Sequence, residues 1–565
     1  MDSESAIVEN LIGCGKYQIW YFLLFQWVTI LQASNIAFMV FGKHFPQIDC
    51  GSGCVPRHFV VDDDGRGMHG FALFGGEMNN GSRHEQSADY LTKCKDLNVS
   101  STQTVQFYSI AIEWRLFCSK EKLSYMILTT QMLGILVGSL VFGQLSDFYG
   151  RKKVLFAALV CQIACGAASA FSNGWRMFTV FRALLGFFGG GTHTTNQVFF
   201  AEVVSAKHRL WLSNIGGWPL GMGVFVVTAW LTRDWRSLSL YSNLMCIPVL
   251  LLLWRLDESP RWRLQHGYWV KAESTLRKFM RAQLGWPIDS KKLNQDLHKL
   301  TKAMSMPQGT NDDACSPEAS PDEGRTVQKQ PIHSGKIRYT YWHLFDSISM
   351  RHYALVVALT HFASSCIAHG IMFHSDALSG DIYINLLLLS TFRWLTNIIT
   401  IIIDACSKCG RKHIFIIPCL AVAICSAIIV LYGNDIAGSK TVTGLALTAG
   451  ALSSPLWIST LLWPAELFPT PVRNLASSFG AVFDRLGGVM IPQILLLAKL
   501  WPGLPYGVFA LLAILAAASV AFVLPETKGH PLPERMPSSC NGAHAWEHAA
   551  LVKESSSDEG CASPV

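Results

Sequence analysis

The chain contains a long series of apolar runs of about 20 residues each, separated by polar stretches. A run of this length crosses the roughly 30 Å hydrocarbon core of a bilayer as an α-helix. The pattern therefore predicts an all-α membrane protein with twelve transmembrane helices. The expected spans are 17–41, 123–145, 154–172, 177–200, 211–231, 236–256, 353–374, 382–404, 414–432, 441–463, 478–499 and 506–524.

The expected spans fall into two groups of six, joined by a long polar linker. Part of this linker is rich in Pro, Ser, Asp and Gly, a composition that predicts a disordered insert. The expected domains are a polar N-terminus (1–16), an N-terminal six-helix half (17–256), a linker (257–352) with its insert (306–337), a C-terminal six-helix half (353–524) and a polar tail (525–565).

A polar segment after the first span, residues 43–122, carries two signs of an extracellular location. It holds both N-x-Ser/Thr sequons of the chain, at Asn80 and Asn98, and such sequons are glycosylation acceptors on secreted surfaces. It also holds an even set of cysteines, which predicts two disulfides and leaves three connectivities open. These cysteines are Cys50, Cys54, Cys94 and Cys118.

Composition and charge agree with this topology. Hydrophobic residues make up 50% of the chain and charged residues 15%, whereas soluble domains contain about a quarter charged residues. Much of the net charge of +7 lies in basic loops on one side of the spans, such as 151–153 and 207–209. Basic loops mark the cytoplasmic side, so the charge indicates topology and not nucleic-acid binding. Both termini are therefore expected in the cytoplasm.

The two groups of spans share loop motifs at nearly equal offsets, 264 and 260 positions (466 − 202 and 410 − 150). A Glu followed seven positions later by an Arg occurs in each half, and so does a Gly-Arg-Lys turn. Two repeats of six helices, with the substrate site between them at mid-membrane, are typical of one class of secondary transporters. The motifs are Glu202 with Arg209, Glu466 with Arg473, Gly150-Arg151-Lys152 and Gly410-Arg411-Lys412.

The charged loop residues suit ion pairs that join helix ends on the cytoplasmic side. An exposed pair contributes only about 0–1 kcal/mol, but a network of pairs biases an equilibrium whose states differ by a few kcal/mol. We expect these pairs to hold the inner side closed and to break when the halves rock. Simple topological anchoring is the alternative. The residues are Asp147, Arg151, Glu202, Arg209, Glu258, Arg261, Glu466 and Arg473.

Charged residues within spans are costly in lipid and usually face a wet cavity or a partner. Arg393 and Arg485 are candidates for gripping a carboxylate or sulfonate with two parallel hydrogen bonds. Neighbours on a helix point about 100° apart, so Asp484 is not expected to meet Arg485. Pairing of Asp484 with Arg393 is an alternative.

Uncharged polar and aromatic residues of the spans complete the candidate substrate site. His361 and His369 lie eight positions apart on nearly one helix face, and each is either a proton carrier or a buried neutral histidine. Gly189-Gly-Gly191 is a place where helices pack closely, and polar residues follow it. The candidate lining residues are His193, Asn196, Asn35, Gln32, Trp218, His361 and Trp457.

Taken together, the motifs resemble those of the major facilitator superfamily. The residues that carry this resemblance are Gly143 to Lys153, Glu202 with Arg209, Glu258-Ser-Pro-Arg-Trp262 and Glu466-Leu-Phe-Pro-Thr-Pro-Val-Arg473. Within it, the chain resembles the organic cation/anion/carnitine (solute carrier 22-like) transporter family in its cysteine-bearing first loop, in Ala465 to Asn474 and in Leu524-Pro-Glu-Thr-Lys-Gly529. This resemblance implies alternating access and transport of small organic ions across the plasma membrane.

The chain departs from the cation-transporting branch of that family at several positions. Arg485 stands where that branch has an Asp in span eleven, and Arg393 stands where it has a Glu in span eight. His361 and Ala368 occupy the places of cavity aromatics in span seven. The resemblance therefore favours organic anions or zwitterions as substrates over cations.

We thus expect a carrier for small organic anions or zwitterions, with a coupling ion or an exchanged anion as a possible further partner and membrane lipid around it. An organic cation or carnitine carrier, with Asp484 as the acid, is the first alternative. A transport-inactive receptor of the same fold is the second. The sequence has no nucleotide-binding loop and no nucleophile motif, and its one C-x-x-C, Cys406 to Cys409, lacks a second suitably spaced ligand pair, so neither an enzyme nor a cofactor is expected.

Overall fold

The computed structural model describes residues 15–44, 107–116, 120–205, 212, 215–281, 340–406, 410–432, 440–469, 471–528 and 533. Regular structure in these residues is helical, apart from an isolated bridge between Tyr108 and Asp234. Several expectations fall outside the described residues: the sequons at Asn80 and Asn98, the cysteines at 50, 54, 94 and 118, Arg209 and the insert 306–337.

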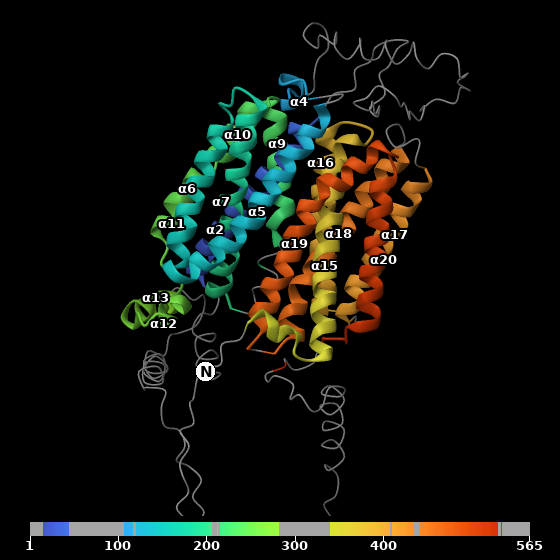
Figure 1. Cartoon of the computed structure of the whole chain (residues 1–565). Coiled ribbons are helices and arrows are strands. Elements are labelled where there is room, and N and C mark those ends of the chain that lie inside the picture. Colours follow the sequence, from blue (N-terminus) through green and yellow to red (C-terminus); the bar gives the residue numbers. More distant parts are fainter. Residues whose placement is uncertain are drawn as a thin grey trace, which may run out of the picture.

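The helices form two bundles that stand side by side (Figure 1). The first bundle, here called the N-terminal half, carries a short helix, α4, at one end and two short helices, α12 and α13, at the other. These ends are called the α4 end and the α12 end below. The half consists of α2 (Lys16–Gly42), α4 (Ile110–Glu113), α5 (Glu121–Tyr149), α6 (Arg151–Ser169), α7 (Trp175–Val203), α9 (Gly217–Thr232), α10 (Trp235–Leu244), α11 (Ile247–Arg255), α12 (Pro260–Gln265) and α13 (Trp269–Arg281).

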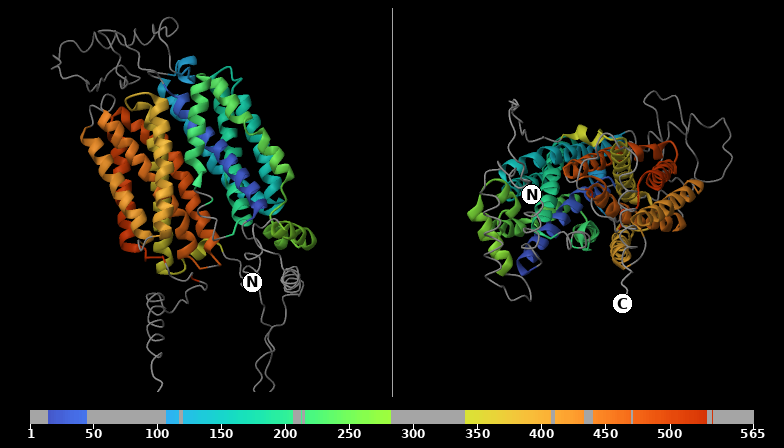
Figure 2. Two further views of the ribbon diagram at one scale, coloured as in Figure 1. Left: turned by 180° about the vertical axis from the view of Figure 1, so that it is seen from behind. Right: turned by 90° about the horizontal axis from the view of Figure 1, so that it is seen from below.

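The second bundle, the C-terminal half, is built from the later part of the chain. Seen from below, the two halves are two neighbouring groups of helices (Figure 2). The C-terminal half consists of η2 (Tyr341–Phe345), α15 (Ile348–His374), η3 (Ser375–Ala377), α16 (Ile382–Cys406), α17 (Arg411–Leu431), α18 (Lys440–Leu467), α19 (Arg473–Leu496), η4 (Leu497–Lys499) and α20 (Leu504–Val523).

Ten helices of the described residues are long and apolar enough to cross a membrane, with α10 and α11 taken as one. The apolar helix α9 is shorter, at 16 residues. Helix α7 is long, at 29 residues, but it carries arginines, glycines and other polar residues that lower its hydropathy. The chain is therefore a multi-pass membrane protein.

The sixth expected span, 236–256, corresponds to the candidate span Trp235–Arg255, but this span is interrupted. It is divided into α10 and α11, with the break at Met245 and Cys246. Pro248 lies at the start of α11 and has no N–H to donate to the preceding turn, so the helix is interrupted there. The predicted span is present, at Trp235–Arg255, and the proline marks a break within it that the hydrophobic pattern alone does not register.

Glycines on α5 and α7 bring the two backbones into direct contact. A Cβ added to Gly138 would collide with the carbonyl oxygen of Phe187, and one added to Gly186 would collide with that of Gln131. Gly190 faces Ile135 in the same way. Small residues at four-residue spacing allow such close packing in membranes, where little hydrophobic force joins helices. The expected close approach near residues 189–191 is confirmed.

The two halves are tied together at the α4 end by ion pairs. Lys43, which caps α2, donates to Asp376 of η3 at 2.9 Å. Lys499 of η4 lies 3.3 Å from Glu121, the first residue of α5. Along the spans, α5 packs on α19 and α9 packs on α16. The contacts of these two helix pairs and the two ion pairs hold the halves against each other.

Candidate functional site

Arg151 joins three helices at the α12 end of the N-terminal half. Its guanidinium donates to Glu202 Oε1 of α7 from Nε at 3.1 Å and from Nη2 at 2.9 Å. The same group pairs with Asp147 of α5 and donates to the Ser146 hydroxyl at 3.2 Å. Because Arg151 begins α6, one side chain connects α5, α6 and α7.

Arg411 repeats this arrangement in the C-terminal half. It begins α17, pairs with Glu466 of α18, and lies 3.5 Å from Asp404 of α16. The two arginines thus occupy equivalent places in the two halves, each between two carboxylates. These contacts agree with the repeat in the sequence, and each arginine pairs with carboxylates of its own half.

A further carboxylate holds the helix start beside each arginine. Glu258 accepts a hydrogen bond from the Lys152 backbone N–H at 3.0 Å. Glu526 accepts one from the Arg411 backbone N–H at 2.8 Å and one from that of Lys412 at 3.3 Å. The first N–H groups of a helix lack partners within the helix, so a carboxylate at this place stabilises it.

The glycine before each arginine makes room for this carboxylate. A Cβ at Gly150 would lie 2.6 Å from Glu258 Oε2, and a Cβ at Gly410 would collide with Glu526. Gly150 also has φ of +104°, a conformation that side chains disfavour. The glycine of the Gly-Arg-Lys motif therefore leaves room for the carboxylate in both halves. In the N-terminal half it also allows the positive φ of the turn.

The two carboxylates differ in their acidity. Burial raises the pKa of Glu258, and the hydrogen bond from Lys152 offsets only part of this effect. Burial also acts to raise the pKa of Glu526, but hydrogen bonds from the Lys528 and Arg411 amides, among others, outweigh it and hold that pKa below its ordinary value. Glu526 therefore stays ionised to lower pH than Glu258.

Two other residues expected in the charged loops have different surroundings. Arg473 donates to the carbonyl oxygens of Phe468 at 3.4 Å and Pro533 at 3.3 Å. These bonds join the start of α19 to the segment that follows α20. Arg261 lies in the first turn of α12, next to the Ser259 hydroxyl that caps this helix.

Five side chains from both halves lie near one another. The ring of His369 on α15 has its centroid 5.9 Å from that of Trp218 on α9 and 6.3 Å from that of Trp457 on α18. His193 of α7 lies within electrostatic range of His369 and of Arg485 on α19. All five side chains are partly exposed. We call them the central cluster.

Arg393 of α16 is buried and bonded to neighbouring helices. Its Nε donates to the Gly450 carbonyl at 2.9 Å, and its Nη2 donates to the Ala368 carbonyl and the Ser453 hydroxyl, both at 2.8 Å. The residue is only 5% exposed. Arg393 therefore connects α16 to α15 and α18, and Asp484 is not among its partners in the described residues.

The expectation that Asp484 and Arg485 do not meet is wrong. Arg485 Nη1 lies 3.6 Å from Asp484 Oδ2. The long arginine side chain bends back toward its neighbour, which the angle between adjacent Cα–Cβ directions does not anticipate. Asp484 is buried, with 7% of its side chain exposed, against 15% for Arg485. Arg485 is thus the more exposed partner of this pair.

Polar residues of α2 are hydrogen-bonded within the N-terminal half. Gln32 donates to Gln162 at 3.1 Å, and Asn35 donates to Asn243 at 3.1 Å. Asn196 of α7 donates to the Phe25 carbonyl at 3.3 Å. Gln32, Asn35 and Asn196 are each 3% exposed, so their side chains join helices in this structure.

Arg182 is a fully buried cation that the sequence reasoning missed. It donates to Gln131 Oε1 at 3.1 Å and to the Asn35 carbonyl at 2.9 Å. Its guanidinium also lies 4.2 Å from the centre of the Phe38 ring, an attractive cation–π geometry. An arginine inside an otherwise apolar stretch of α7 was the signal in the sequence.

His361 and His369 have different environments despite their shared helix face. His361 is 7% exposed, and its Nδ1 lies 2.8 Å from the Val357 carbonyl. A Cβ at Gly480 would lie 2.7 Å from the His361 ring, so this histidine packs directly on α19. His369, in contrast, is partly exposed between Trp218 and Trp457.

Comparison with known proteins gives a family and a fold. The family model described as "Sugar (and other) transporter" matches residues 76–536. Among curated proteins, solute carrier family 22 member 7 of Bos taurus is 25% identical, and the match covers 94% of each chain. Organic anion transporter 3 of Sus scrofa is 28% identical, over 75% of this chain and 73% of its own.

Among solved structures, the inward open conformation of the xylose transporter XylE from E. coli matches with a TM-score of 0.60. The match covers 91% of this chain and 98% of that one, at 16% identity. A partially occluded inward open conformation of the same protein matches with a TM-score of 0.58. At this identity the likeness concerns the fold. The chain belongs to the sugar (and other) transporter family and has the all-helical fold of the major facilitator superfamily.

Proposed function

We propose that this protein carries small organic ions across the plasma membrane by alternating access, and that organic anions or zwitterions are its substrates. The family assignment supports transport, and the names of the solute carrier family 22 relatives, among them an organic anion transporter, support organic ions. The observation that carries the proposal is the central cluster, where His369 lies between Trp218 and Trp457 of different halves and Arg485 lies within electrostatic range of His193 and His369.

The proposed topology has twelve spans, with both termini in the cytoplasm. Ten apolar helices, the shorter α9 and the more polar α7 together give this number. Basic loops follow α5 and α16 at the α12 end, so the positive-inside rule assigns that end to the cytoplasm. The segment 43–122, with its sequons and cysteines, then belongs outside.

The proposed substrate site is the central cluster, with Arg485 as the principal ligand. Arg393 is bound to two carbonyls and a hydroxyl, so its role is to hold α16 in place and to add positive potential. Asp484 offsets part of the charge of Arg485. Two arginines against one aspartate leave a net positive charge, which favours a carboxylate or sulfonate.

Trp218 and Trp457 add aromatic surfaces to the proposed substrate site. They stand edge-on to His369 from different halves, so a planar group inserted there would contact both halves at once. Aromatic side chains contribute large apolar contact areas and add specific ring–ring geometry. We therefore propose that an aromatic or otherwise planar organic anion fits this site better than a small aliphatic one.

Alternation between two states is supported by the position of the ion pairs. At the α4 end, Lys43–Asp376 and Lys499–Glu121 join the two halves. At the α12 end, Arg151 and Arg411 pair within their own halves. This distribution fits a state closed toward the outside and open toward the cytoplasm. In the opposite state, which is closed toward the cytoplasm, the charges at the α12 end would form the gating pairs between the halves that the sequence predicts.

A cation or carnitine carrier is the alternative that one observation favours. Asp484 lies in the same span as Arg485 and within 3.6 Å of it. A zwitterion with an ammonium and a carboxylate group would use both side chains. A receptor without transport activity remains the second alternative, and it makes no use of the Arg151 and Arg411 networks.

Uptake by the full chain in proteoliposomes tests the proposal. The panel contains an aromatic carboxylate, a quaternary ammonium carboxylate, a simple quaternary ammonium and a hexose, each labelled and each measured against protein-free vesicles. Uptake of the first two, and not of the others, is the expected result. Uptake of the simple quaternary ammonium alone would replace anion transport by cation transport. Absence of uptake for the whole panel would favour the receptor.

A further inference from the structure

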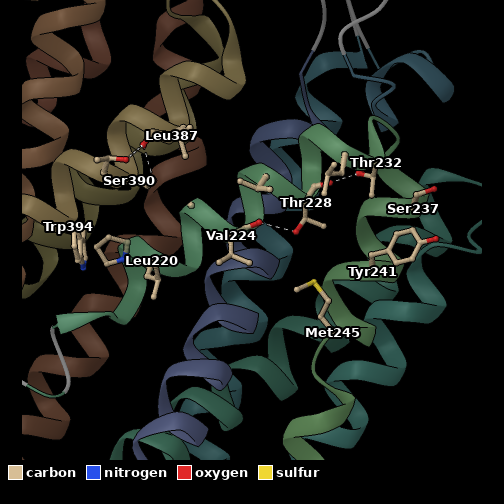
Figure 3. Close-up of a pocket in the computed structure, with 15 residues that line it drawn as sticks. Leu220, Val224, Thr228, Thr232, Ser237, Tyr241, Met245, Leu387, Ser390 and Trp394 are labelled. Atoms are coloured by element: carbon tan, nitrogen blue, oxygen red, sulfur yellow. Dashed lines mark hydrogen bonds between the residues drawn. The ribbon is translucent and has the colours of Figure 1, made fainter.

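A groove of about 1040 Å³ lies on the outer flank of the bundle, apart from the central cluster. In Figure 3 the labelled residues of α9 lie between those of α16 and those of α10. Helix α9 therefore forms the floor of the groove, and α16 and α10 form its sides. The lining residues are Pro219, Leu220, Gly223, Val224, Val227, Thr228, Leu231, Thr232, Ser237, Tyr241, Met245, Leu387, Ser390, Thr391 and Trp394.

The groove faces the bilayer. Its sides lie on α16 and on the α10–α11 span, both long enough to cross a membrane, and its middle lies on the shorter apolar helix α9. Its side chains remain exposed: Leu231 is 68% exposed, Tyr241 55% and Val227 47%. None of the five residues of the central cluster lines it. A molecule that occupies the groove therefore comes from the membrane.

The chemistry of the lining selects among membrane molecules. All lining residues are uncharged, so the groove offers no partner for a phosphate or another lipid headgroup. Most of its hydroxyl groups are already bonded: those of Thr228, Thr232 and Thr391 donate to carbonyls of their own helices. Such bonds satisfy a hydroxyl within lipid, where no water is available.

Tyr241 is different. Within the described residues its hydroxyl makes no hydrogen bond, although it lies in an apolar groove on a spanning helix. A polar group in hydrocarbon without a partner is costly. A rigid apolar molecule with a single hydroxyl would satisfy it and would fill the apolar wall with little loss of conformational entropy. A sterol has this chemistry, and a phospholipid does not.

The two sides of the groove belong to different halves. Trp394 of α16 donates from Nε1 to the Ile215 carbonyl, just before α9, at 2.8 Å. Gly223 of α9 faces Ser390 of α16, and a Cβ there would lie 3.4 Å from the hydroxyl. Any rocking of the halves changes the spacing of α9 and α16, so an occupant of the groove favours one state over the other.

We propose that this groove is a sterol-binding site, in which the sterol hydroxyl bonds to Tyr241 and the ring system packs along α9 between α16 and α10. The sterol stabilises the state in which α9 and α16 are spaced as in this structure. The site is separate from the substrate site, and its occupancy does not depend on which organic ion is carried.

Photolabelling of the purified full chain tests the proposal. The probe is a cholesterol analogue with a diazirine and an alkyne, reconstituted in phosphatidylcholine vesicles, and the labelled peptides are identified by mass spectrometry. We expect labelling concentrated on peptides of α9, α10 and α16, and displaced by unlabelled cholesterol. Labelling spread over all lipid-facing helices, or displaced equally by added phosphatidylcholine, would overturn the site.

Two variants and one control variant sharpen the test. Val227→Trp fills the groove, whereas Val137→Trp on α5, where the residue is 44% exposed, makes the same change outside the groove. We expect at least fivefold weaker labelling for Val227→Trp alone. Tyr241→Phe removes only the hydroxyl, and we expect it to weaken competition by cholesterol about three- to tenfold, the effect of one hydrogen bond. Equal labelling of both Trp variants, or unchanged competition in Tyr241→Phe, would contradict the proposal.

Discussion

Lys43 and Asp376 form an ion pair at 2.9 Å that joins the two halves of the protein at the α4 end. Lys43 is nearly buried, with 5% of its side chain exposed, and its ammonium also lies 5.3 Å from the centre of the Tyr125 ring. A shielded pair is screened less by solvent than a surface pair. Opening of the α4 end requires this contact to break.

Reversal of one partner is therefore expected to favour opening of the α4 end. Lys43→Glu places two carboxylates in contact, and Asp376→Lys places two ammonium groups in contact. Loss of a charged hydrogen bond of this kind costs about 1.5–3 kcal/mol, so we expect a shift of about 10- to 100-fold in the opening equilibrium. Hydrogen exchange at the end of α2 and at η3 measures it.

The double variant Lys43→Glu with Asp376→Lys is the control, because it restores the pair with reversed polarity. We expect it to recover most of the protection from exchange. Equal exchange in the single variants and the parent chain would mean that the pair does not hold this end closed.

The two loop carboxylates predict an order of events on acidification. The pKa of Glu526 is lowered, so its stabilising effect is present at neutral pH and is lost only as the pH falls through that lowered value. The pKa of Glu258 is raised, so the folded protein binds this proton more tightly than an unfolded chain would, and this group takes up its proton first as the pH falls.

Amide exchange reports this order directly. Glu258 binds the Lys152 amide and Glu526 binds the Arg411 amide. After correction for intrinsic exchange, we expect protection of the Lys152 amide to change at a higher pH than that of the Arg411 amide. The reverse order, or a common midpoint, would contradict the assigned acidities.

The contact of α5 with α7 predicts a large effect from one methyl group. Gly138→Ala puts a Cβ against the Phe187 carbonyl, which must move. Overpacking of this kind costs about 1–3 kcal/mol. Gly143→Ala on the same helix is the matched control, since its Cβ would lie 3.8 Å from Thr194. Thermal unfolding in detergent should separate the two variants, and equal melting temperatures would argue against tight packing there.

The two histidines of α15 are expected to respond differently to replacement by alanine. His369→Ala removes the ring between Trp218 and Trp457, and we expect KM to rise about tenfold with little change in melting temperature. His361→Ala leaves a space beside Gly480, and we expect a lower melting temperature with KM nearly unchanged. The opposite pattern would place His361 and not His369 at the substrate.

Much of the architecture follows from the sequence because spans are long and charged motifs are repeated. The apolar runs predicted the helices to within a few residues in most cases, and the Gly-Arg-Lys motifs predicted where Arg151 and Arg411 would pair. Glu526 was missed as the counterpart of Glu258, although Leu524-Pro-Glu-Thr echoes Leu256-Asp-Glu-Ser.

The site was harder to predict because spacing along one helix says little about contacts between helices. Gln32 and Asn35 looked like lining residues, yet they bond to Gln162 and Asn243 on neighbouring helices. His369 received less weight than His361, since nothing in the sequence places Trp218 and Trp457 around it.

The ion pair between Lys43 and Asp376 could not be predicted from the sequence, for the same physical reason. The residues are 333 positions apart, and each looks like an ordinary polar residue at the end of an apolar run. Only the packing of α2 against η3 brings them together. Contacts between the two halves depend on the state of the protein, and a linear pattern does not encode one state.

The central claim is that the positive charge of Arg485, exposed to the central cluster, selects the substrate. The most direct measurement is uptake of an aromatic carboxylate and of a quaternary ammonium by Arg485→Asp, with Arg255→Asp as a control for the same charge change at an exposed helix end. We predict that Arg485→Asp lowers carboxylate uptake at least 100-fold, gains quaternary ammonium uptake, and differs from the control in both. Carboxylate uptake at the full parental rate in Arg485→Asp would contradict the account.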